Sequence, residues 1–164
     1  LFAFGAFTGC TDLYWVSQTG DGSFQMSIPS PCPPESDDPS NFCYSEQSGD
    51  PFGPEDLFAK MQEWDEAKYL MCAGSASGSD ATTNAKGIVQ GHAFTILQVA
   101  DDPAGSGVQL IKMRNPWGSQ EWTGAWSDQS SEWQDYPDVA EELEWTSEDD
   151  GTFWIPFENF TINF

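Results

Sequence analysis

The sequence predicts an α+β domain, built from a twisted antiparallel β-sheet that tends towards a barrel and one main helix on its flank. Two observations carry this prediction. Apolar residues recur at helical spacing over residues 54–68, and two strand-length apolar runs, 92–99 and 108–114, are separated by a loop rich in Asp and Gly. A chain of 164 residues can bury one sizeable core, so one domain or half of a two-lobed enzyme is expected.

The main helix is expected to begin at Pro54 and to run to about Lys68. Proline suits the first helical position, and the two acidic residues that follow it suit the positive end of the helix dipole. A short buried strand over 69–73 and a Gly/Ser/Thr-rich loop over 74–86 should come next. The helix is expected to bury one face, formed by Leu57, Phe58, Met61 and Trp64.

Residues 21–52, ahead of this helix, have a different composition. They include six prolines, seven serines and six acidic residues, and they lack Lys and Arg. Such a segment buries too little apolar surface to offset the entropy lost on ordering. We therefore expect an acidic Pro/Ser-rich surface insertion that is partly disordered.

The runs 92–99 and 108–114 should form an antiparallel hairpin, which brings the start of the first strand beside the end of the second. His92 and Asn115 should then be neighbours. A short acidic helix over 135–143 and a last strand over 152–157, ending or lying at an edge because of Pro156, complete the expected elements. The remaining core is expected to contain Leu70, Ile96, Leu97, Val99, Leu110, Ile111, Phe153 and Trp154.

The chain is strongly acidic, with 27 Asp and Glu against 5 Lys and Arg and a net charge of −22. This balance argues against nucleic acid or an anionic membrane surface as a partner. Excess carboxylate suits divalent cations, basic partners or a saline environment, although its commonest meaning is a well-solvated surface. The apolar start, 1–7, is too short to span a bilayer and lacks the basic region of a signal peptide, so we expect no transmembrane segment and an intracellular, cytoplasmic location.

The four cysteines follow no metal-ligand spacing, so free and mostly inert thiols are expected at Cys10, Cys32, Cys43 and Cys72. None stands in the polarising, partly exposed setting that a nucleophilic thiol needs, and Cys72 falls in an apolar strand. Cys32 and Cys43 could close a loop in an oxidising compartment, and residues 159–161 match a glycosylation acceptor. Neither signal outweighs the intracellular assignment.

A histidine beside an asparagine supplies two of the three groups of a cysteine-protease triad. The imidazole takes a proton from the thiol, and the asparagine oxygen accepts the other ring N–H without adding a second negative charge. The third group, a reactive cysteine, is not visibly supplied by this chain. Two simpler interpretations stay open: His92 as an ordinary packed histidine, and Asn115 as a turn residue ahead of Pro116.

Four segments of the sequence resemble the second protease-core subdomain of calpains, the calcium-dependent intracellular cysteine proteases. They are Gly-His-Ala-Phe at 91–94, Arg-Asn-Pro-Trp-Gly at 114–118, Glu-Trp-Thr-Gly-Ala-Trp-Ser-Asp at 121–128 and Asp-Gly-Thr-Phe-Trp at 150–154. More loosely, residues 7–14 and 57–72 resemble the opening segment of that subdomain and its helix and strand.

This resemblance implies a papain-like fold whose nucleophilic cysteine lies on a preceding subdomain. Residues 1–164 would then be the His/Asn subdomain, a fragment of a larger catalytic domain, with 21–52 as an insertion in it. His92 would be the general base, Asn115 would orient it, and the indole of Trp117 would shield the hydrogen bond between them. Core packing is the alternative interpretation of Trp117.

The resemblance also implies Ca²⁺ as a cofactor, held by Glu121, Asp128 and the Asp150 segment, with a backbone carbonyl from Glu148. Carboxylates from two loops suit a hard cation that takes several oxygen ligands. Thr152 stands where better-known calpains have a glutamate, so loss of one carboxylate ligand and a lower affinity are expected, unless the Thr152 hydroxyl or a water takes its place. The alternative is that these acids belong to a solvated face.

The sequence therefore predicts the His/Asn-bearing half of a calcium-dependent intracellular cysteine endopeptidase. It would hydrolyse polypeptide substrates through an acyl-thiolate intermediate, and it would be inactive without the cysteine-bearing subdomain of the same full-length chain. A calpain-like pseudoprotease acting as a calcium-responsive binding or scaffold module is the alternative, distinguished by the lack of a glutamine and a cysteine upstream. An extracellular glycan-binding domain rests only on the tryptophans and the glycosylation acceptor.

Overall fold

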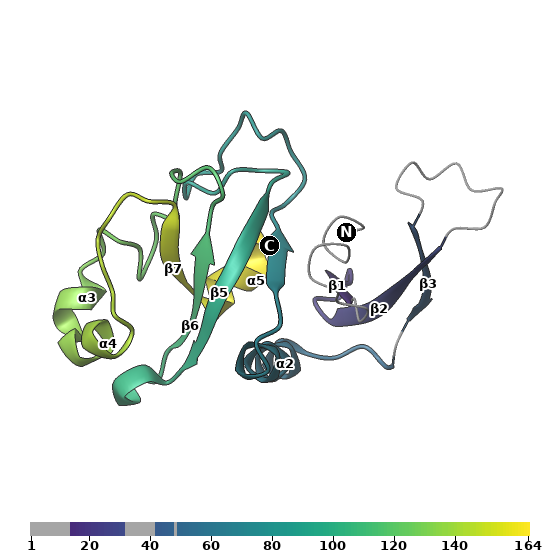
Figure 1. Ribbon diagram of the computed structural model, residues 1–164, viewed down its shortest axis with the longest axis horizontal. Helices are drawn as coiled ribbons and strands as arrows, with labels where there is room; N and C mark the ends of the chain where they lie inside the picture. Colours follow the sequence, from purple (N-terminus) through teal and green to yellow (C-terminus); the bar gives the residue numbers. More distant parts are fainter. Residues whose placement is uncertain (1–13, 32–41, 48) are drawn as a thin grey trace. The chain divides into compact units, whose positions relative to one another are not determined.

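A computed structural model describes residues 14–31, 42–47 and 49–164 of the chain (Figure 1). The chain forms two compact units, residues 1–57 and 58–164. Predictions made for residues 7–13 and for Cys10 and Cys32 lie outside the described residues. None of the described helices is long and apolar enough to cross a bilayer.

The first unit contains a three-stranded antiparallel sheet in the order β1-β2-β3. Its strands are β1 (Trp15–Gln18), β2 (Phe24–Pro31) and β3 (Phe42–Gln47). Phe24 is buried and stacks on Phe52, with ring centroids 6.3 Å apart. Within the segment 21–52, for which a partly disordered insertion was predicted, the described strands β2 and β3 pair through cross-strand backbone hydrogen bonds although the average composition of the segment is polar.

Helix α2 (Pro54–Glu66) confirms the predicted helix, with Glu55 and Asp56 in its first turn. Phe58 and Met61 are buried on it. The strand that follows, β4 (Met71–Gly74), is an edge strand of the second sheet rather than a buried one. The core assignment of Leu70 is wrong, since its side chain is 66% exposed, and the thiol of Cys72 is exposed as well.

The second unit is built on an antiparallel sheet in the order β4-β5-β6-β7. The predicted hairpin is confirmed as β5 (Ala93–Asp101) and β6 (Gln109–Arg114), linked by the 3₁₀ turn η1 (Pro103–Gly105). Strand β7 (Thr152–Pro156) pairs with β6 and forms the other edge, as Pro156 predicted. Among the described strands no pairing joins β4 to β7, so the sheet is open and not a closed barrel.

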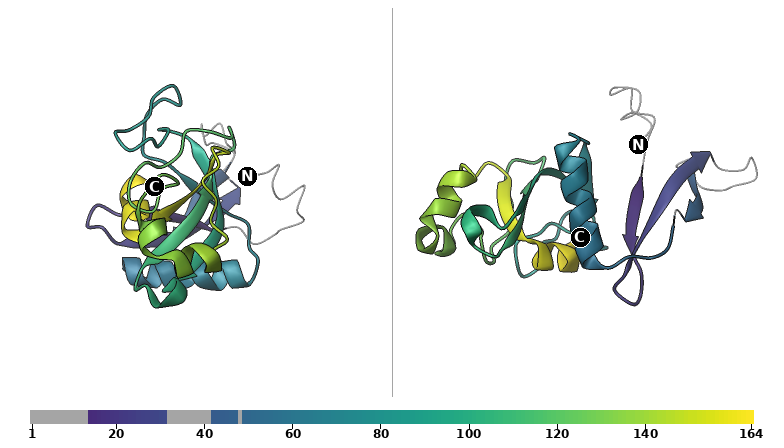
Figure 2. Two further views of the ribbon diagram at one scale, coloured as in Figure 1. Left: turned by 90° about the vertical axis from the view of Figure 1, so that its left-hand side faces the viewer. Right: turned by 90° about the horizontal axis from the view of Figure 1, so that it is seen from below.

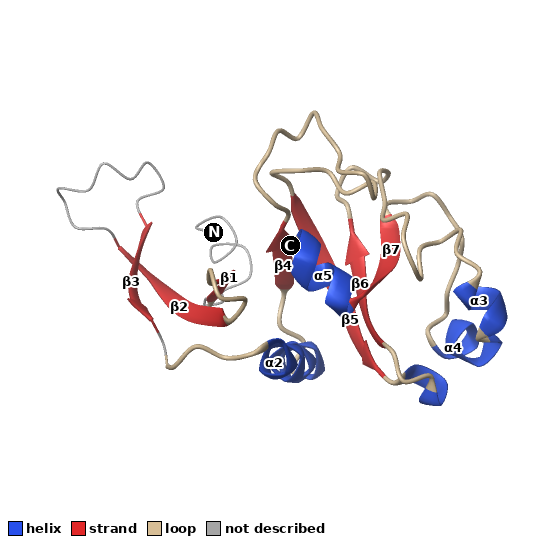
Figure 3. Ribbon diagram, turned by 180° about the vertical axis from the view of Figure 1, so that it is seen from behind, coloured by secondary structure: helices blue, strands red, loops and turns tan. Residues whose placement is uncertain are grey.

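One face of this sheet packs against α2 and against α5 (Phe157–Asn163), a helix that the sequence analysis missed. Phe58 meets Phe157 edge-on at 4.9 Å between ring centroids. Phe94 of β5 lies 6.1 Å from Phe153 of β7 and 5.2 Å from Phe164. Figure 3, seen from the side opposite to Figure 1, shows α5 lying across this face in front of the strands.

The opposite face carries a tryptophan cluster packed with residues of α3 (Glu132–Asp135) and α4 (Pro137–Glu142). Figure 2 shows the backbone of these two helices from two further directions. Trp133 is the hub, meeting Trp126 edge-on at 4.7 Å and stacking on Trp145 at 5.1 Å. The acidic helix predicted near Pro137 is confirmed by α4. The core cluster on this face comprises Ala100, Leu110, Trp126, Trp133, Val139, Leu143 and Trp154.

Leu97 of β5 marks a part of the sheet that the tryptophan cluster does not cover. Its neighbour Ile96 is buried on the α5 side, and a bulge between Ile96 and Gln98 shifts the register with β6. Leu97 is 44% exposed, so its assignment to the core is wrong. Consecutive strand residues point to opposite faces, and the described part of the chain does not fully cover the face to which Leu97 points.

Candidate active site

His92 and Asn115 lie at the same end of the β5–β6 hairpin. His92 directly precedes β5, and Asn115 directly follows β6. The antiparallel register pairs Thr95 with Arg114, which places the two side chains together although 23 residues separate them. The Nε2 atom of His92 lies 3.0 Å from Oδ1 of Asn115.

The amide of Asn115 is fully buried, and its hydrogen-bond partners fix its orientation. Its Nδ2 donates to the backbone carbonyls of Ser119 at 2.7 Å and Gln120 at 3.2 Å. Its Oδ1 accepts the backbone N–H of Trp117 at 3.0 Å. Oδ1 must therefore face the imidazole, and because an amide oxygen only accepts, Nε2 of His92 carries the proton.

This network leaves Nδ1 as the unprotonated nitrogen of the neutral ring. Nδ1 is then the atom that can take a proton from an incoming thiol or water.

Two aromatic rings hold the imidazole in place. Trp117 lies 4.3 Å away at an interplanar angle of 45°, and Phe94 meets the ring edge-on at 5.1 Å. Trp117 is 47% exposed, although its indole lies against the imidazole.

Gly151 joins this pair to an acidic loop. Its carbonyl accepts the backbone N–H of Asn115 at 2.8 Å, and its own N–H donates to Oε1 of Glu121 at 2.6 Å. Gly151 has a φ of +86°, and a Cβ placed there would lie 2.6 Å from the carbonyl oxygen of Asn115. Only glycine allows this close approach. Gly151 therefore connects the backbone of Asn115 to the carboxylate of Glu121 through two hydrogen bonds, one on each side of the glycine.

Asp128 is a buried carboxylate beside Glu121. Its side chain is 8% exposed, and its Oδ2 has no hydrogen-bond partner among the described residues. Burial, together with repulsion from the neighbouring Glu121 carboxylate, raises the pKa of Asp128 to about 7, and Asp150 and Asp149 add to this repulsion. A buried carboxylate with an unpartnered oxygen favours either a proton or a cation beside it.

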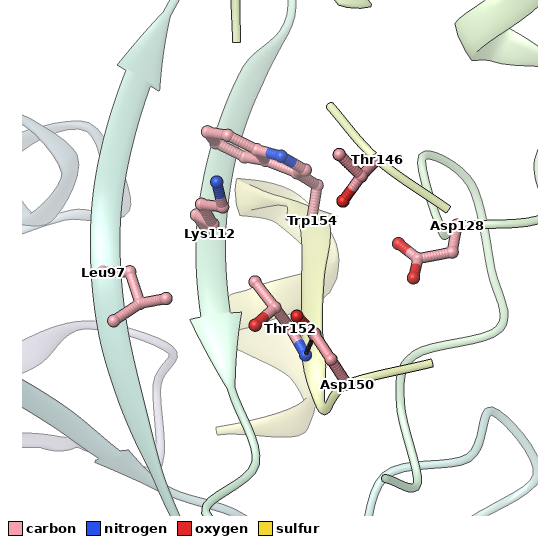
Figure 4. Close-up of a pocket in the computed structure, with 7 residues that line it drawn as sticks. All are labelled: Leu97, Lys112, Asp128, Thr146, Asp150, Thr152 and Trp154. Atoms are coloured by element: carbon pink, nitrogen blue, oxygen red, sulfur yellow. Dashed lines mark hydrogen bonds between the residues drawn. The ribbon is translucent and has the colours of Figure 1, made fainter. Parts of the chain in front are cut away.

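A cavity of about 220 Å³ opens at this point of the sheet (Figure 4). Asp150 and Thr152 line it from the start of β7, and Asp128 lines it from the loop that follows Gly124. The backbone N–H of Thr152 donates to Oδ1 of Asp150 at 2.8 Å. This hydrogen bond is the main reason why the pKa of Asp150 lies below its usual value. The other lining residues are Leu97, Lys112, Thr146 and Trp154.

The donors around this cavity are of the type that Ca²⁺ takes, since they are carboxylate oxygens and one of them is buried without a partner. Their placement is incomplete. Among the described residues, no three His, Cys, Asp or Glu side chains are close enough together to hold a metal ion. Glu121 and Asp128 are neighbours, while the exposed Glu148 contributes its backbone carbonyl to the Asp150 N–H at 3.0 Å.

Comparison with known proteins identifies the family. The sequence profile of the calpain family cysteine proteases matches residues 42–164. The rice protein "Calpain-type cysteine protease ADL1" (Oryza sativa subsp. japonica) is 39% identical over 110 residues, covering 66% of this chain and 5% of that protein. Mouse calpain-9 is 39% identical over 118 residues, covering 68% of this chain and 17% of the relative. The chicken calpain-1 catalytic subunit is 47% identical over 92 residues, covering 55% and 13%.

The chain belongs to the calpain family of cysteine proteases, because the family profile matches well over half of its length. It spans less than a fifth of each of these three relatives. The structure brings together His92, Asn115 and Trp117 on one side of Gly151, and Glu121 and Asp128 on the other. The sequence analysis gave Gly151 no role of its own, although this glycine lies in the Asp-Gly-Thr-Phe-Trp segment that resembles calpains.

Proposed function

We propose that this chain is the His/Asn-bearing half of an intracellular calcium-dependent cysteine endopeptidase. The hydrogen bond between His92 and Asn115 carries the proposal, because the buried amide fixes both the position and the tautomer of the imidazole. A histidine used only for packing would not need a partner whose four hydrogen-bonding contacts all define one orientation. The nucleophilic cysteine would come from another part of the full-length protein.

In this proposal Nδ1 of His92 takes the proton of that cysteine, giving a thiolate and an imidazolium. The thiolate attacks the carbonyl carbon of the substrate peptide bond. The imidazolium then gives its proton to the leaving amine nitrogen, and the C–N bond breaks to leave an acyl thioester. In the second half, Nδ1 takes a proton from water as the water oxygen attacks the thioester carbon. The C–S bond then breaks, the carboxylic acid product leaves, and the imidazolium returns its proton to the sulfur.

Asn115 acts on the ring throughout this cycle. Its Oδ1 accepts the Nε2–H in both charge states of the imidazole, so the ring keeps its orientation while Nδ1 gains and loses a proton. Trp117 covers this hydrogen bond and limits the competition from water. Cleavage by the half chain alone is not expected, because the described chemistry needs the thiol.

Ca²⁺ would be held first by the neighbouring carboxylates of Glu121 and Asp128. The carboxylate of Asp150 and the backbone carbonyl of Glu148 would join them only if the acidic loop rearranges, since no three acidic side chains of the described residues stand close enough together for a metal ion. In that position the ion would offset part of the negative charge that these carboxylates bring together. Glu121 also accepts the Gly151 N–H, and Gly151 accepts the Asn115 N–H. Ordering of the acidic loop is therefore transmitted to the residue that orients His92 through two consecutive hydrogen bonds.

The test is peptide hydrolysis by the intact full-length protein with Ca²⁺, comparing wild type with His92→Ala and Asn115→Ala. Both substitutions should reduce kcat by several orders of magnitude. Gln109→Ala is the matched control, because Gln109 lies at the opposite end of the same hairpin and is exposed. Wild-type activity in His92→Ala would overturn the proposal.

A second comparison separates the endopeptidase from the pseudoprotease. Wild-type protein with and without a Ca²⁺ chelator is assayed for hydrolysis and, in parallel, for thermal stability. Hydrolysis that requires Ca²⁺ supports the proposal. A Ca²⁺-dependent rise in Tm with no hydrolysis at any Ca²⁺ concentration favours the binding module, and an unchanged Tm removes the calcium site from the proposal.

A further inference from the structure

Ser75 lies just beyond β4, opposite His92. The register of β4 and β5 pairs Gly74 with Ala93, so the next pair along the ladder is Ser75 with His92. The Ser75 N–H donates to the carbonyl of His92 at 2.9 Å, as in a regular antiparallel ladder. The hairpin base therefore extends by one residue towards the candidate active site.

The second hydrogen bond of this residue pair does not join two backbone groups. In a regular ladder the His92 N–H would donate to the Ser75 carbonyl, whereas here it donates to the Ser75 hydroxyl at 3.1 Å. The same hydroxyl lies 2.6 Å from the carbonyl oxygen of Val89 and 3.2 Å from that of His92. A side chain thus takes the place of a backbone acceptor directly ahead of the imidazole.

The directions of these bonds follow from what a hydroxyl can do. Serine has one proton to donate and two lone pairs that accept. The shortest contact takes the proton, so Ser75 donates to Val89 and accepts from the His92 N–H. Removing the hydroxyl leaves the part-buried His92 N–H without its acceptor and releases the carbonyl of the fully buried Val89.

The backbone on the other side of His92 has little room to compensate. Gly91 has a φ of +60°, and a Cβ placed there would lie 2.4 Å from the carbonyl oxygen of Gly78. Its N–H donates to the carbonyl of Ala76 at 2.8 Å. The backbone just before β5 is therefore confined by its close contact with Gly78. The hydrogen bond to the Ser75 hydroxyl then fixes the backbone of His92 on its other side.

We propose that Ser75 is a positioning residue for His92, holding its backbone where the imidazole reaches Asn115. This inference rests on the proposed function only for what the ring does chemically. The geometry makes a narrower statement that can be tested without catalysis. Without the hydroxyl, the bond between Nε2 of His92 and Oδ1 of Asn115 should open more often.

The sole histidine of the chain provides the measurement. In the ¹⁵N-labelled 164-residue chain, the imidazole nitrogens report the tautomer, and the Nε2–H reports solvent exchange. Ser75→Ala should exchange this proton about tenfold faster than wild type, the factor expected when one buried N–H loses its partner. Ser75→Thr, which keeps a hydroxyl, should restore slow exchange. Ser79→Ala is the matched control, because its hydroxyl accepts only a loop N–H, from Ala81, at 3.2 Å.

Equal exchange rates in Ser75→Ala and Ser79→Ala would overturn the proposal, and so would failure of Ser75→Thr to restore the rate. If Ser75→Ala does not fold, Ser75→Cys replaces it. Its thiol keeps the volume but bonds weakly, so exchange should rise by a smaller factor, and an unchanged rate would again overturn the proposal.

Hydrolysis by the intact protein is measured separately. There Ser75→Ala should lower kcat by about tenfold and leave KM unchanged, since Ser75 touches the base and not the substrate. An inactive wild type whose Nε2–H is nonetheless protected would remove the proposed function and leave the positioning role in place. An active Ser75→Ala with unchanged kcat would overturn the positioning role alone.

Discussion

Substitution of Gly151 by alanine should destabilise the second unit and at the same time break the hydrogen bond between the Asn115 N–H and the carbonyl of residue 151. The new Cβ would stand 2.6 Å from the carbonyl oxygen of Asn115 and 2.8 Å from the Cα of Gly118, where ordinary contacts begin at 3.4 Å. Both neighbours are backbone, so neither can turn aside as a side chain can. A left-handed conformation costs a non-glycine residue about 1–2 kcal/mol, and forced repacking adds about 1–3 kcal/mol.

The expected loss in the free energy of unfolding is therefore about 2–5 kcal/mol. Gly107→Ala isolates the backbone part, because Gly107 has a φ of +73° and nothing within 4 Å of an added Cβ. It should lose only about 1–2 kcal/mol. Urea unfolding measures both variants, and the ring nitrogens of His92 show whether the tautomer is lost in Gly151→Ala alone. Equal losses in the two variants would refute the contact argument.

Three further substitutions test other parts of the site and core. Trp117→Ala should expose the hydrogen bond on Nε2 of His92 to water and lower kcat about fivefold with little change in Tm, and an unchanged kcat would contradict the shielding role. Thr152→Glu adds a carboxylate to the cavity and should tighten Ca²⁺ binding about tenfold in a calorimetric titration; weaker or equal binding would count against the site. Trp133→Ala removes a buried indole that donates to the Ser127 carbonyl at 2.9 Å, and should cost about 3–5 kcal/mol by urea unfolding. A loss below about 1 kcal/mol would place the cluster outside the cooperative core.

Local patterns were sufficient for the elements that depend on local spacing. The period of the apolar residues in α2 and the two apolar runs of the hairpin predict those elements, because each pattern reflects which face is buried. The neighbourhood of His92 and Asn115 follows from antiparallel pairing alone. Their hydrogen bond at 3.0 Å is a property of the structure.

Average composition and the alternation of apolar residues did not predict structure that depends on contacts between residues far apart in the sequence. The polar composition of 21–52 hides the pairing of β2 with β3, and the apolar Leu70 and Leu97 are exposed because of an edge position and a partly uncovered face. Helix α5 follows Pro156 without a break, where a continued strand was predicted to reach Phe157. Tertiary packing of Phe157 and Phe160 against neighbouring rings decides this segment, whose β-branched and aromatic residues do not indicate a helix.

The site residues that the sequence could not reveal act through their backbone or through a single atom. Gly151 matters because it has no side chain, and Ser75 matters because its oxygen replaces a carbonyl. Neither residue type is unusual in a loop. Only the positions of Asn115 and His92 in three dimensions give these two residues their significance.

The rear of the Asn115 amide determines which residue type this position accepts. An aspartate has almost the same shape and could receive the Nε2–H of His92 equally well. Its second oxygen, however, would point at the carbonyl oxygens of Ser119 and Gln120, where Nδ2 now donates at 2.7 and 3.2 Å. Three acceptors would then face one another without a proton in a fully buried place. The choice of amide over acid is thus imposed by the loop behind the residue, and an exchange between the two would require that loop to be rebuilt first.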